Sequence, residues 1–221
     1  MTTTAIDTLT SRALLYKLIA TGFDYPTEKL LMSLSTEEYY DGFVEVVTPL
    51  GGRLLEITKA ARKKVLQEAR LEKLEAFEIE YNRIFQLSHV DACPLTASEY
   101  MKGESRQAMA VAQLRGLYRS FGVTTRPARE PDHLSILCEF MSLLCAKESR
   151  AHNAGVQQRV DDCVAAQTIV IEDFLSFVPL LQKAVSAHAR KEYYLWMAAV
   201  TVEFIALERE LFLLSTGSHN R

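Results

Sequence analysis

Four consecutive residues, Glu130-Pro131-Asp132-His133, place two carboxylates and an imidazole at the mouth of a strongly apolar segment. Such groups can transfer protons or bind a metal ion. Glu130 and His133 form a Glu-x-x-His pair, the ligand pattern that helical di-iron proteins carry on two of their helices. The sequence has no second Glu-x-x-His, and Pro131 puts Glu130 at a helix boundary. A helical metal-binding protein that uses Glu130 and His133 is therefore the alternative interpretation.

The same residues have a structural interpretation. Proline is favoured at the first position of a helix, so Pro131 predicts Glu130 as the N-cap, with Asp132 and His133 in the first turn. A carboxylate there meets the positive end of the helix dipole, worth about 0.3–1 kcal/mol. One narrow polar stripe then follows the otherwise apolar helix: Asp132, Ser135, Glu139 and Ser142. The stripe is expected to face a partner helix, a wet groove or a bound segment.

No motif in the sequence demands catalysis. The chain has no GxxxxGK[ST], GxSxG, HExxH or GxGxxG pattern, each of which marks a known kind of active site. The four cysteines contain no CxxC pair, so they are expected to be buried thiols and not zinc ligands or disulfides. The sequence predicts no enzyme and no cofactor.

The elements that position these residues are helices. Apolar residues recur at helical spacing almost everywhere, and few segments alternate as strands do. The sequence therefore predicts an all-α protein, a single-domain helical bundle of roughly eight or more helices. Pro26 breaks the chain and Thr27 caps the helix that follows. The other helices are expected over residues 8–22, 37–47, 53–85 (as one helix or two), 98–121, 134–148, 156–174, 180–188 and 192–214.

Composition narrows the functional class. A length of 221 residues suits one domain over 1–221, with a hinge at 122–130, and the net charge of -3 argues against nucleic acid as a partner. The amino terminus shows no secretory signal, which indicates a cytoplasmic protein. The longest apolar stretch, 193–202, is shorter than the roughly 20 residues of a membrane span, so no stable membrane insertion is expected.

Several segments, in this order and spacing, resemble the TorD/DmsD/NarJ-like redox enzyme maturation chaperones. The matching segments are RALLYKLIATGFDYPTEKLLMSL (12–34), EYNRIF (80–85) followed by a proline loop and SEY (98–100), EPDHLSILCEFMSLL (130–144) and YYLWMAAVTVEFIALE (193–208). The resemblance implies a cytoplasmic all-helical chaperone that binds the twin-arginine leader, or the amino-terminal segment, of a molybdenum-cofactor oxidoreductase subunit. It would hold this precursor back from export until the cofactor is inserted.

The resemblance also implies where the leader binds. The family's binding residues map onto the 130–133 loop, the central helix and the proline loop. With the acidic residues of the 130–139 segment included, the expected leader-binding residues are Glu130, Asp132, His133, Glu139, Tyr81, Ile84, Phe85, Pro94, Ser98 and Tyr100. A leader offers two guanidinium groups and an apolar run, so an acidic rim and an apolar groove suit it. Glu75, Glu78, Glu80 and Glu99 are further candidates for the rim, and Phe77 for the groove or the core.

Two other interpretations stay open beside this one. One is the metal-binding protein described above, and the other is a plain helical scaffold or a nucleotide-binding protein, although no phosphate loop is present. The partner expected from the resemblance is the precursor of a molybdoenzyme catalytic subunit. A monomer is expected, with a domain-swapped dimer through residues 122–129 as the alternative.

Overall fold

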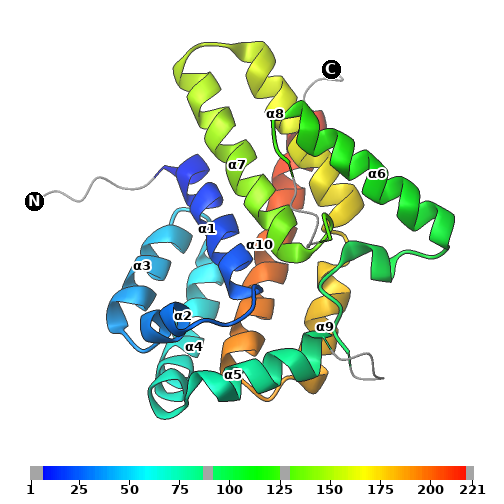
Figure 1. Cartoon of the computed structure of the whole chain (residues 1–221). Helices are drawn as coiled ribbons and strands as arrows, with labels where there is room; N and C mark the ends of the chain where they lie inside the picture. Colours follow the sequence, from blue (N-terminus) through cyan, green and yellow to red (C-terminus); the bar gives the residue numbers. More distant parts are fainter. Residues whose placement is uncertain (1–6, 87–91, 125–129, 218–221) are drawn as a thin grey trace, which may run out of the picture.

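The computed structural model describes residues 7–86, 92–124 and 130–217 (Figure 1). In these ranges the chain forms ten α-helices and no strand, so the all-α prediction is confirmed. The α-helices are α1 (Thr8–Gly22), α2 (Glu28–Leu34), α3 (Glu37–Val47), α4 (Gly52–Leu71), α5 (Leu74–Tyr81), α6 (Glu104–Ser120), α7 (Leu134–Asn153), α8 (Gln157–Ile169), α9 (Val178–His188) and α10 (Glu192–Gly217). Three shorter segments are the π-helices η1 (Asn82–Gln86) and η3 (Val170–Phe174) and the 3-10 helix η2 (Ala97–Tyr100).

The first three helices begin at capping side chains. Asp7, Thr27 and Thr36 each accept a hydrogen bond from the backbone N–H three residues later, at 2.9, 3.2 and 3.4 Å. These bonds satisfy N–H groups that have no partner within the helix. The bounds predicted for α1 and α3 and the cap at Thr27 are confirmed.

The prediction of one helix over residues 98–121 is wrong. The chain leaves η2 at Met101 and begins α6 only at Glu104, after Gly103 with a φ of 91°. Glycine adopts such a φ readily because it has no Cβ, so Gly103 permits the change of direction. The segment 53–85, where one helix or two were expected, is α4 and α5, and its last turn widens into η1.

The core is organised around α10, which crosses the centre of the molecule in Figure 1 and packs against α4 and α9. Tyr16 on α1 meets Phe204 on α10 edge to face, with ring centroids 4.6 Å apart. The end of α1 approaches α10 so closely that a Cβ on Gly22 would lie 2.5 Å from Met197 Cε. Gly22 therefore ends α1 and also permits this close packing.

Helix α1 also packs along α7, which explains the polar stripe of α7. Ser142 Oγ donates a hydrogen bond to the carbonyl oxygen of Ala13 at 2.8 Å, and Glu139 forms an exposed ion pair with Lys17 at 2.8 Å. Of the three environments considered for the stripe, a partner helix accounts for these two residues. Glu139, a predicted leader-binding residue, thus lies on the α1 side of α7.

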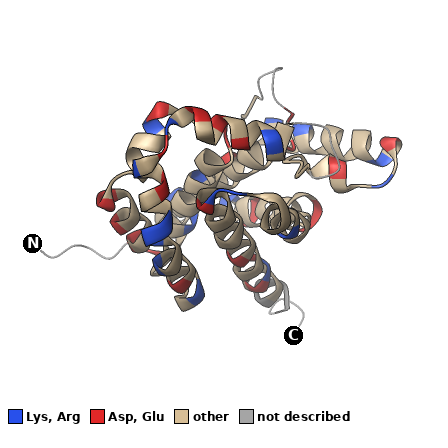
Figure 2. Ribbon diagram, turned by 90° about the horizontal axis from the view of Figure 1, so that it is seen from below, with Lys and Arg blue, Asp and Glu red and all other residues tan. Residues whose placement is uncertain are grey.

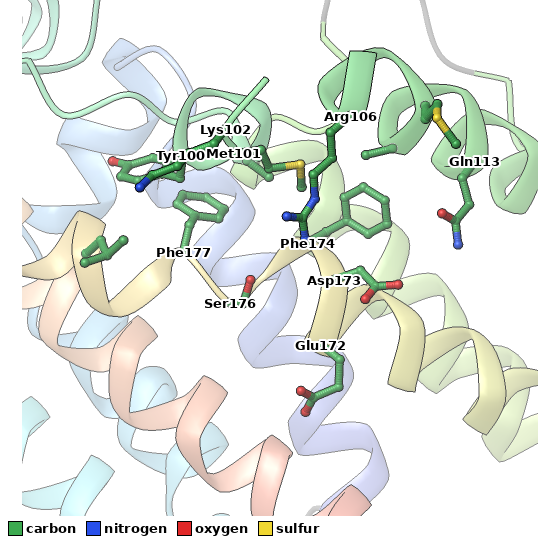
Figure 3. Close-up of a pocket in the computed structure, with 14 residues that line it drawn as sticks. Tyr100, Met101, Lys102, Arg106, Gln113, Glu172, Asp173, Phe174, Ser176 and Phe177 are labelled. Carbon is green, nitrogen blue, oxygen red and sulfur yellow. The ribbon is translucent and has the colours of Figure 1, made fainter. Parts of the chain in front are cut away.

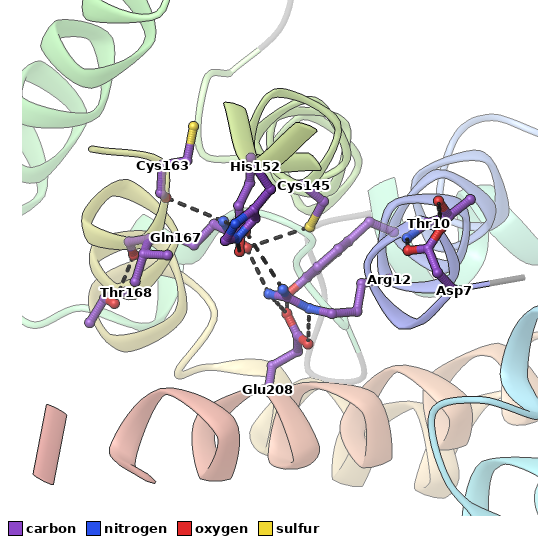
Figure 4. A network of polar contacts seen from close by, with 12 residues as sticks. Asp7, Thr10, Arg12, Cys145, His152, Cys163, Gln167, Thr168 and Glu208 are labelled. Carbon is purple, nitrogen blue, oxygen red and sulfur yellow. Dashed lines mark hydrogen bonds and ion pairs between the residues drawn. The ribbon is translucent and has the colours of Figure 1, made fainter. Parts of the chain in front are cut away.

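A buried polar network joins α1, α7, α8 and α10 (Figure 4). Arg12, 4% exposed, donates to both carboxylate oxygens of Glu208 at 2.7 and 2.8 Å and to Gln167 Oε1 at 2.7 Å. Gln167 Nε2 donates to Glu148 Oε2 at 2.6 Å. Burial lowers the pKa of Arg12, but hydrogen bonding and charge attraction from Glu208 outweigh burial and raise it. The guanidinium therefore stays charged and fixes four helices together.

Three further features concern the cysteines, the charged residues and the apolar helices. All four cysteines are free and buried, as predicted, and burial raises the pKa of the Cys145 thiol to about 12. Figure 2 shows Lys and Arg interspersed with Asp and Glu over the helices. Across the described ranges, no single helix has the length and hydropathy of a membrane span, although α8–η3 and α9, bent by 48°, meet both criteria as a pair.

The hinge and swap segment predicted at 122–130 falls largely outside the described residues, which omit 125–129.

Candidate functional site

The Glu-Pro-Asp-His loop is bound by its backbone to the segment before η2. Thr96 and His133 form an isolated antiparallel bridge. Leu134 N donates to the carbonyl oxygen of Leu95 at 2.7 Å, and Ala97 N donates to that of Asp132 at 3.1 Å. Two segments more than thirty residues apart in sequence are therefore held in a fixed register.

The contact between these two segments, residues 95–98 and 131–134, is called the junction below. Asp132 stabilises it with its side chain. Its side chain is buried, and Oδ2 accepts the backbone N–H of Ser98 at 2.7 Å. The carboxylate therefore caps η2 and not α7, which corrects the prediction. Tyr118 of α6 adds a hydrogen bond of 2.7 Å to the carbonyl oxygen of Pro131, and burial, with the nearby Asp132 charge, raises the pKa of Tyr118. Ser98, predicted to bind the leader, uses its N–H within the junction.

The N-cap of α7 is His133, so the prediction of Glu130 as the cap is wrong. His133 Nδ1 accepts the Ser135 N–H at 3.2 Å and lies 2.8 Å from Ser135 Oγ. Pro131 and Asp132 form a turn in which His133 N donates to the carbonyl oxygen of Glu130 at 3.1 Å, and His133 itself is extended and bridged to Thr96, so the helix starts at Leu134. Glu130 is exposed. In the part of the chain that the structure describes, no three His, Cys, Asp or Glu residues are grouped as metal ligands, so no donor set supports the Glu130/His133 metal site.

The junction forms one wall of a pocket of about 330 Å³, here called the first pocket. Its lining includes four predicted residues, Tyr81, Phe85, Pro94 and His133, with Glu99 at its edge. The Tyr81 and Phe85 rings meet edge to face with centroids 5.1 Å apart, and the Tyr81 hydroxyl donates to the carbonyl oxygen of Phe23 at 3.2 Å. The structure thus brings together residues from three separate segments that the sequence singled out.

Ile84 and Tyr100 do not line the first pocket. Ile84 is fully buried, and its carbonyl oxygen accepts the N–H of Cys93 at 2.6 Å. The Tyr100 hydroxyl donates to the carbonyl oxygen of Pro94 at 3.0 Å, while its ring stacks on Phe177 with centroids 4.8 Å apart. Ile84 therefore supports the pocket from within the core, and Tyr100 lies on the other side of η2.

On that side is a second pocket, of about 660 Å³, between η2, α6, η3 and α9 (Figure 3). Met101, Met109 and Leu180 give it apolar walls, and Met109 and Leu180 are largely exposed. Figure 3 shows Arg106 of α6 reaching toward Phe174 and Ser176 of the opposite wall. Of this pocket only Tyr100 was predicted. The side chains that the sequence missed come from α6, η3, α9 and the residues beside them, and their meeting is set by tertiary packing.

Each of these two pockets is lined in part by a π-helix. Phe85 and Gln86 of η1 line the first pocket, and Glu172, Asp173 and Phe174 of η3 line the second. Single π-helical turns are rare and occur often at functional sites, because the wider turn re-aims side chains. The sequence carried no signal for this, since both segments have ordinary helical periodicity.

The acidic rim is smaller than expected. Glu80 is buried and forms a bidentate ion pair with Arg83, with both N···O distances 2.8 Å, and also accepts the N–H of Arg190. Burial alone would raise the pKa of Glu80, but these hydrogen bonds outweigh burial and lower it. Phe77, for which both the groove and the core were considered, lies in the core. Of the predicted acidic residues, Glu99 is the one that lines the first pocket.

The described residues thus form an all-helical fold with two pockets beside the short helix η2. A family model described as nitrate reductase delta subunit matches residues 47–181, more than half of the chain. The chain therefore belongs to the nitrate reductase delta subunit family, which confirms the resemblance to redox enzyme maturation chaperones. A solved structure of a proposed redox enzyme maturation protein from Archaeoglobus fulgidus shares the fold, at 21% identity and a TM-score of 0.50, over 88% of this chain and 93% of that one. No curated protein matches the sequence.

Proposed function

We propose that the protein is a cytoplasmic, system-specific chaperone of molybdoenzyme maturation. It binds the twin-arginine leader or the amino-terminal segment of a molybdenum-cofactor oxidoreductase subunit and assists cofactor insertion, folding and export. It performs no catalysis and acts as a monomer. Family membership supports the maturation role, and one observation carries the assignment of the site. Tyr81, Phe85, Pro94 and His133, from three separate segments, line the same pocket.

The chemistry of the first pocket suits such a segment. Glu99 offers an exposed carboxylate, and a guanidinium binds a carboxylate through two parallel hydrogen bonds. The Tyr81 and Phe85 rings line the same pocket, although these residues are only 4% and 9% exposed, and they can pack against the apolar residues that follow a twin-arginine pair. The second pocket, on the other side of η2, offers Tyr100 and Met101 as further apolar lining. An acidic group next to aromatic rings distinguishes this groove from a purely apolar one.

The test is calorimetric titration with a synthetic twin-arginine leader, and with the same peptide carrying alanine at both arginines. We expect the native peptide to bind and the alanine peptide to bind at least about tenfold more weakly, since a hydrogen bond to a charged group contributes about 1.5–3 kcal/mol. Glu99→Gln should reduce the affinity, and Glu38→Gln, an equally exposed carboxylate on α3, should not. Equal binding of both peptides would refute recognition of the arginines.

A further inference from the structure

A third pocket, of about 510 Å³, lies where the ends of α6 and α7 meet the start of α8. It shares no residue with the two pockets beside η2. Its charged lining residues are Lys147 and Arg150 of α7 and Arg159 and Asp162 of α8. We call it the basic pocket, because three cations and one carboxylate give it a net charge of +2 in a protein whose net charge is -3.

Among the residues that the structure describes, the three cations of the basic pocket have no carboxylate partner. None of Lys147, Arg150 and Arg159 forms an ion pair with a residue that the structure describes, although Asp162 lines the same pocket. Asp162 instead accepts a hydrogen bond from Gln158 Nε2 at 3.0 Å. By contrast, Arg62 and Arg209, elsewhere on the surface, each hold a carboxylate within 3.0 Å.

The cations converge because of helical spacing. Lys147 and Arg150 are three residues apart on α7, and neighbours at this spacing share a helix face. Arg159 faces them from α8, which packs along α7. Like charges at such positions repel one another, at a cost similar to the gain of an ion pair. An anion between them would turn this repulsion into attraction.

We propose that the basic pocket binds the phosphate group of a small anion, either inorganic phosphate or a simple phosphate monoester. A phosphate monoester carries about -1.5 to -2 charges near neutral pH, which matches the net charge of the pocket better than one carboxylate does. Guanidinium groups such as those of Arg150 and Arg159 bind phosphate oxygens bidentately. The concave shape favours a small ligand that the cations surround.

The remaining walls of the basic pocket are apolar and leave room for the organic part of a monoester. Phe121 at the end of α6, Ala151 on α7, Ala154 just after α7, and Val156 line it. Val156 is the N-cap of α8 and has no capping side-chain hydrogen bond, so the positive end of this helix dipole adds to the potential from the cations. Phosphate contacts are thus expected from the cations and van der Waals contacts from Phe121 and Val156.

The experiment is a titration of the isotopically labelled full chain with inorganic phosphate and, separately, with glycerol phosphate, followed by backbone amide NMR. We expect shifts confined to the start of α8 and the end of α7. The double variant Arg150→Gln/Arg159→Gln should weaken binding about tenfold or more, because two charge-assisted hydrogen-bonding groups are removed. The control Lys29→Gln/Lys183→Gln removes the same charge from exposed lysines outside the pocket, and its affinity should be unchanged.

Three outcomes would overturn the proposal. The first is the absence of shifts at α7 and α8 with both ligands. The second is equal weakening in the two double variants, which would show a general charge effect. The third is a glutamate-rich peptide that binds at these residues and is not displaced by phosphate. Because the basic pocket is separate from the groove around η2, loss of phosphate binding should leave leader binding intact, and each proposal can fail alone.

Discussion

Removing the carboxylate of Asp132 should loosen the junction behind the first pocket without removing a ligand contact. Its Oδ2 accepts the Ser98 N–H at 2.7 Å from a buried position, and a hydrogen bond to a charged group contributes about 1.5–3 kcal/mol. We therefore expect Asp132→Ala to lower the free energy of unfolding by about 2 kcal/mol. For a chain of this size, that corresponds to a fall in Tm of roughly 4–8 °C. Asp132→Asn keeps an acceptor oxygen and should cost about half as much.

The measurement is urea unfolding followed by circular dichroism, paired with leader titration of each folded variant. Glu130→Gln is the control, because Glu130 belongs to the same loop but is exposed, and its stability should change by less than about 0.5 kcal/mol. Leader affinity should fall with Asp132→Ala in proportion to the loss of order in η2. If Asp132→Asn keeps full stability but loses leader binding, Asp132 contacts the ligand directly and the structural role assigned to it is wrong.

Two further predictions concern the buried charged residues Arg12 and Glu80, which line none of the three pockets. Arg12→Ala leaves Glu208 buried without its partner and should lower the free energy of unfolding in urea by about 3–5 kcal/mol. The control Arg53→Ala breaks an exposed pair and should lower it by less than about 1 kcal/mol. Similar losses in both variants would contradict the burial argument. The folded-state pKa of Glu80 lies below its unfolded value because hydrogen bonds from Arg83 and a backbone N–H outweigh burial. The stabilisation by Glu80 is therefore present above the unfolded-state pKa and is lost as the pH falls through the lower folded-state pKa. Glu80→Gln should accordingly flatten the acid side of a plot of unfolding free energy against pH. An unaltered acid side would show that protonation of Glu80 is not linked to folding.

The sequence predicted those parts of the fold that depend on neighbouring residues. Thr27 caps its helix, and α1 and α3 have the predicted bounds, because caps and apolar spacing act within a few residues. The break before α6 was missed. Ser98 is bonded to Asp132, which lies 34 residues away in sequence, and Gly103 by itself is a weak signal. Tertiary contacts of this kind override local propensity.

The candidate site divides in the same way. Tyr81, Phe85, Pro94 and His133 were identified by the resemblance, and the structure places them around one pocket. The second and the basic pockets were not predicted, since each depends on how helices distant in sequence meet. Glu130 was assigned to the cap of α7 because the rule for proline at the first helical position considers only adjacent residues, whereas the bridge between Thr96 and His133 moves the helix start.

The Glu-Pro-Asp-His loop therefore mainly supports the structure beside the pockets, whereas other side chains are proposed to recognise the ligand. Its backbone and Asp132 Oδ2 hold η2, whereas the buried Asp132 Oδ1 has no hydrogen-bond partner among the described residues. Tyr81 and Phe85 line the first pocket and also belong to the core, whereas Glu99 and Arg106 are exposed side chains at the pockets. Changes at these surface positions can alter the preferred peptide at little cost in stability, whereas changes at Asp132 alter both stability and binding. In the proposed leader-binding role, this division would let the frame stay constant while the contact surface is fitted to the peptide.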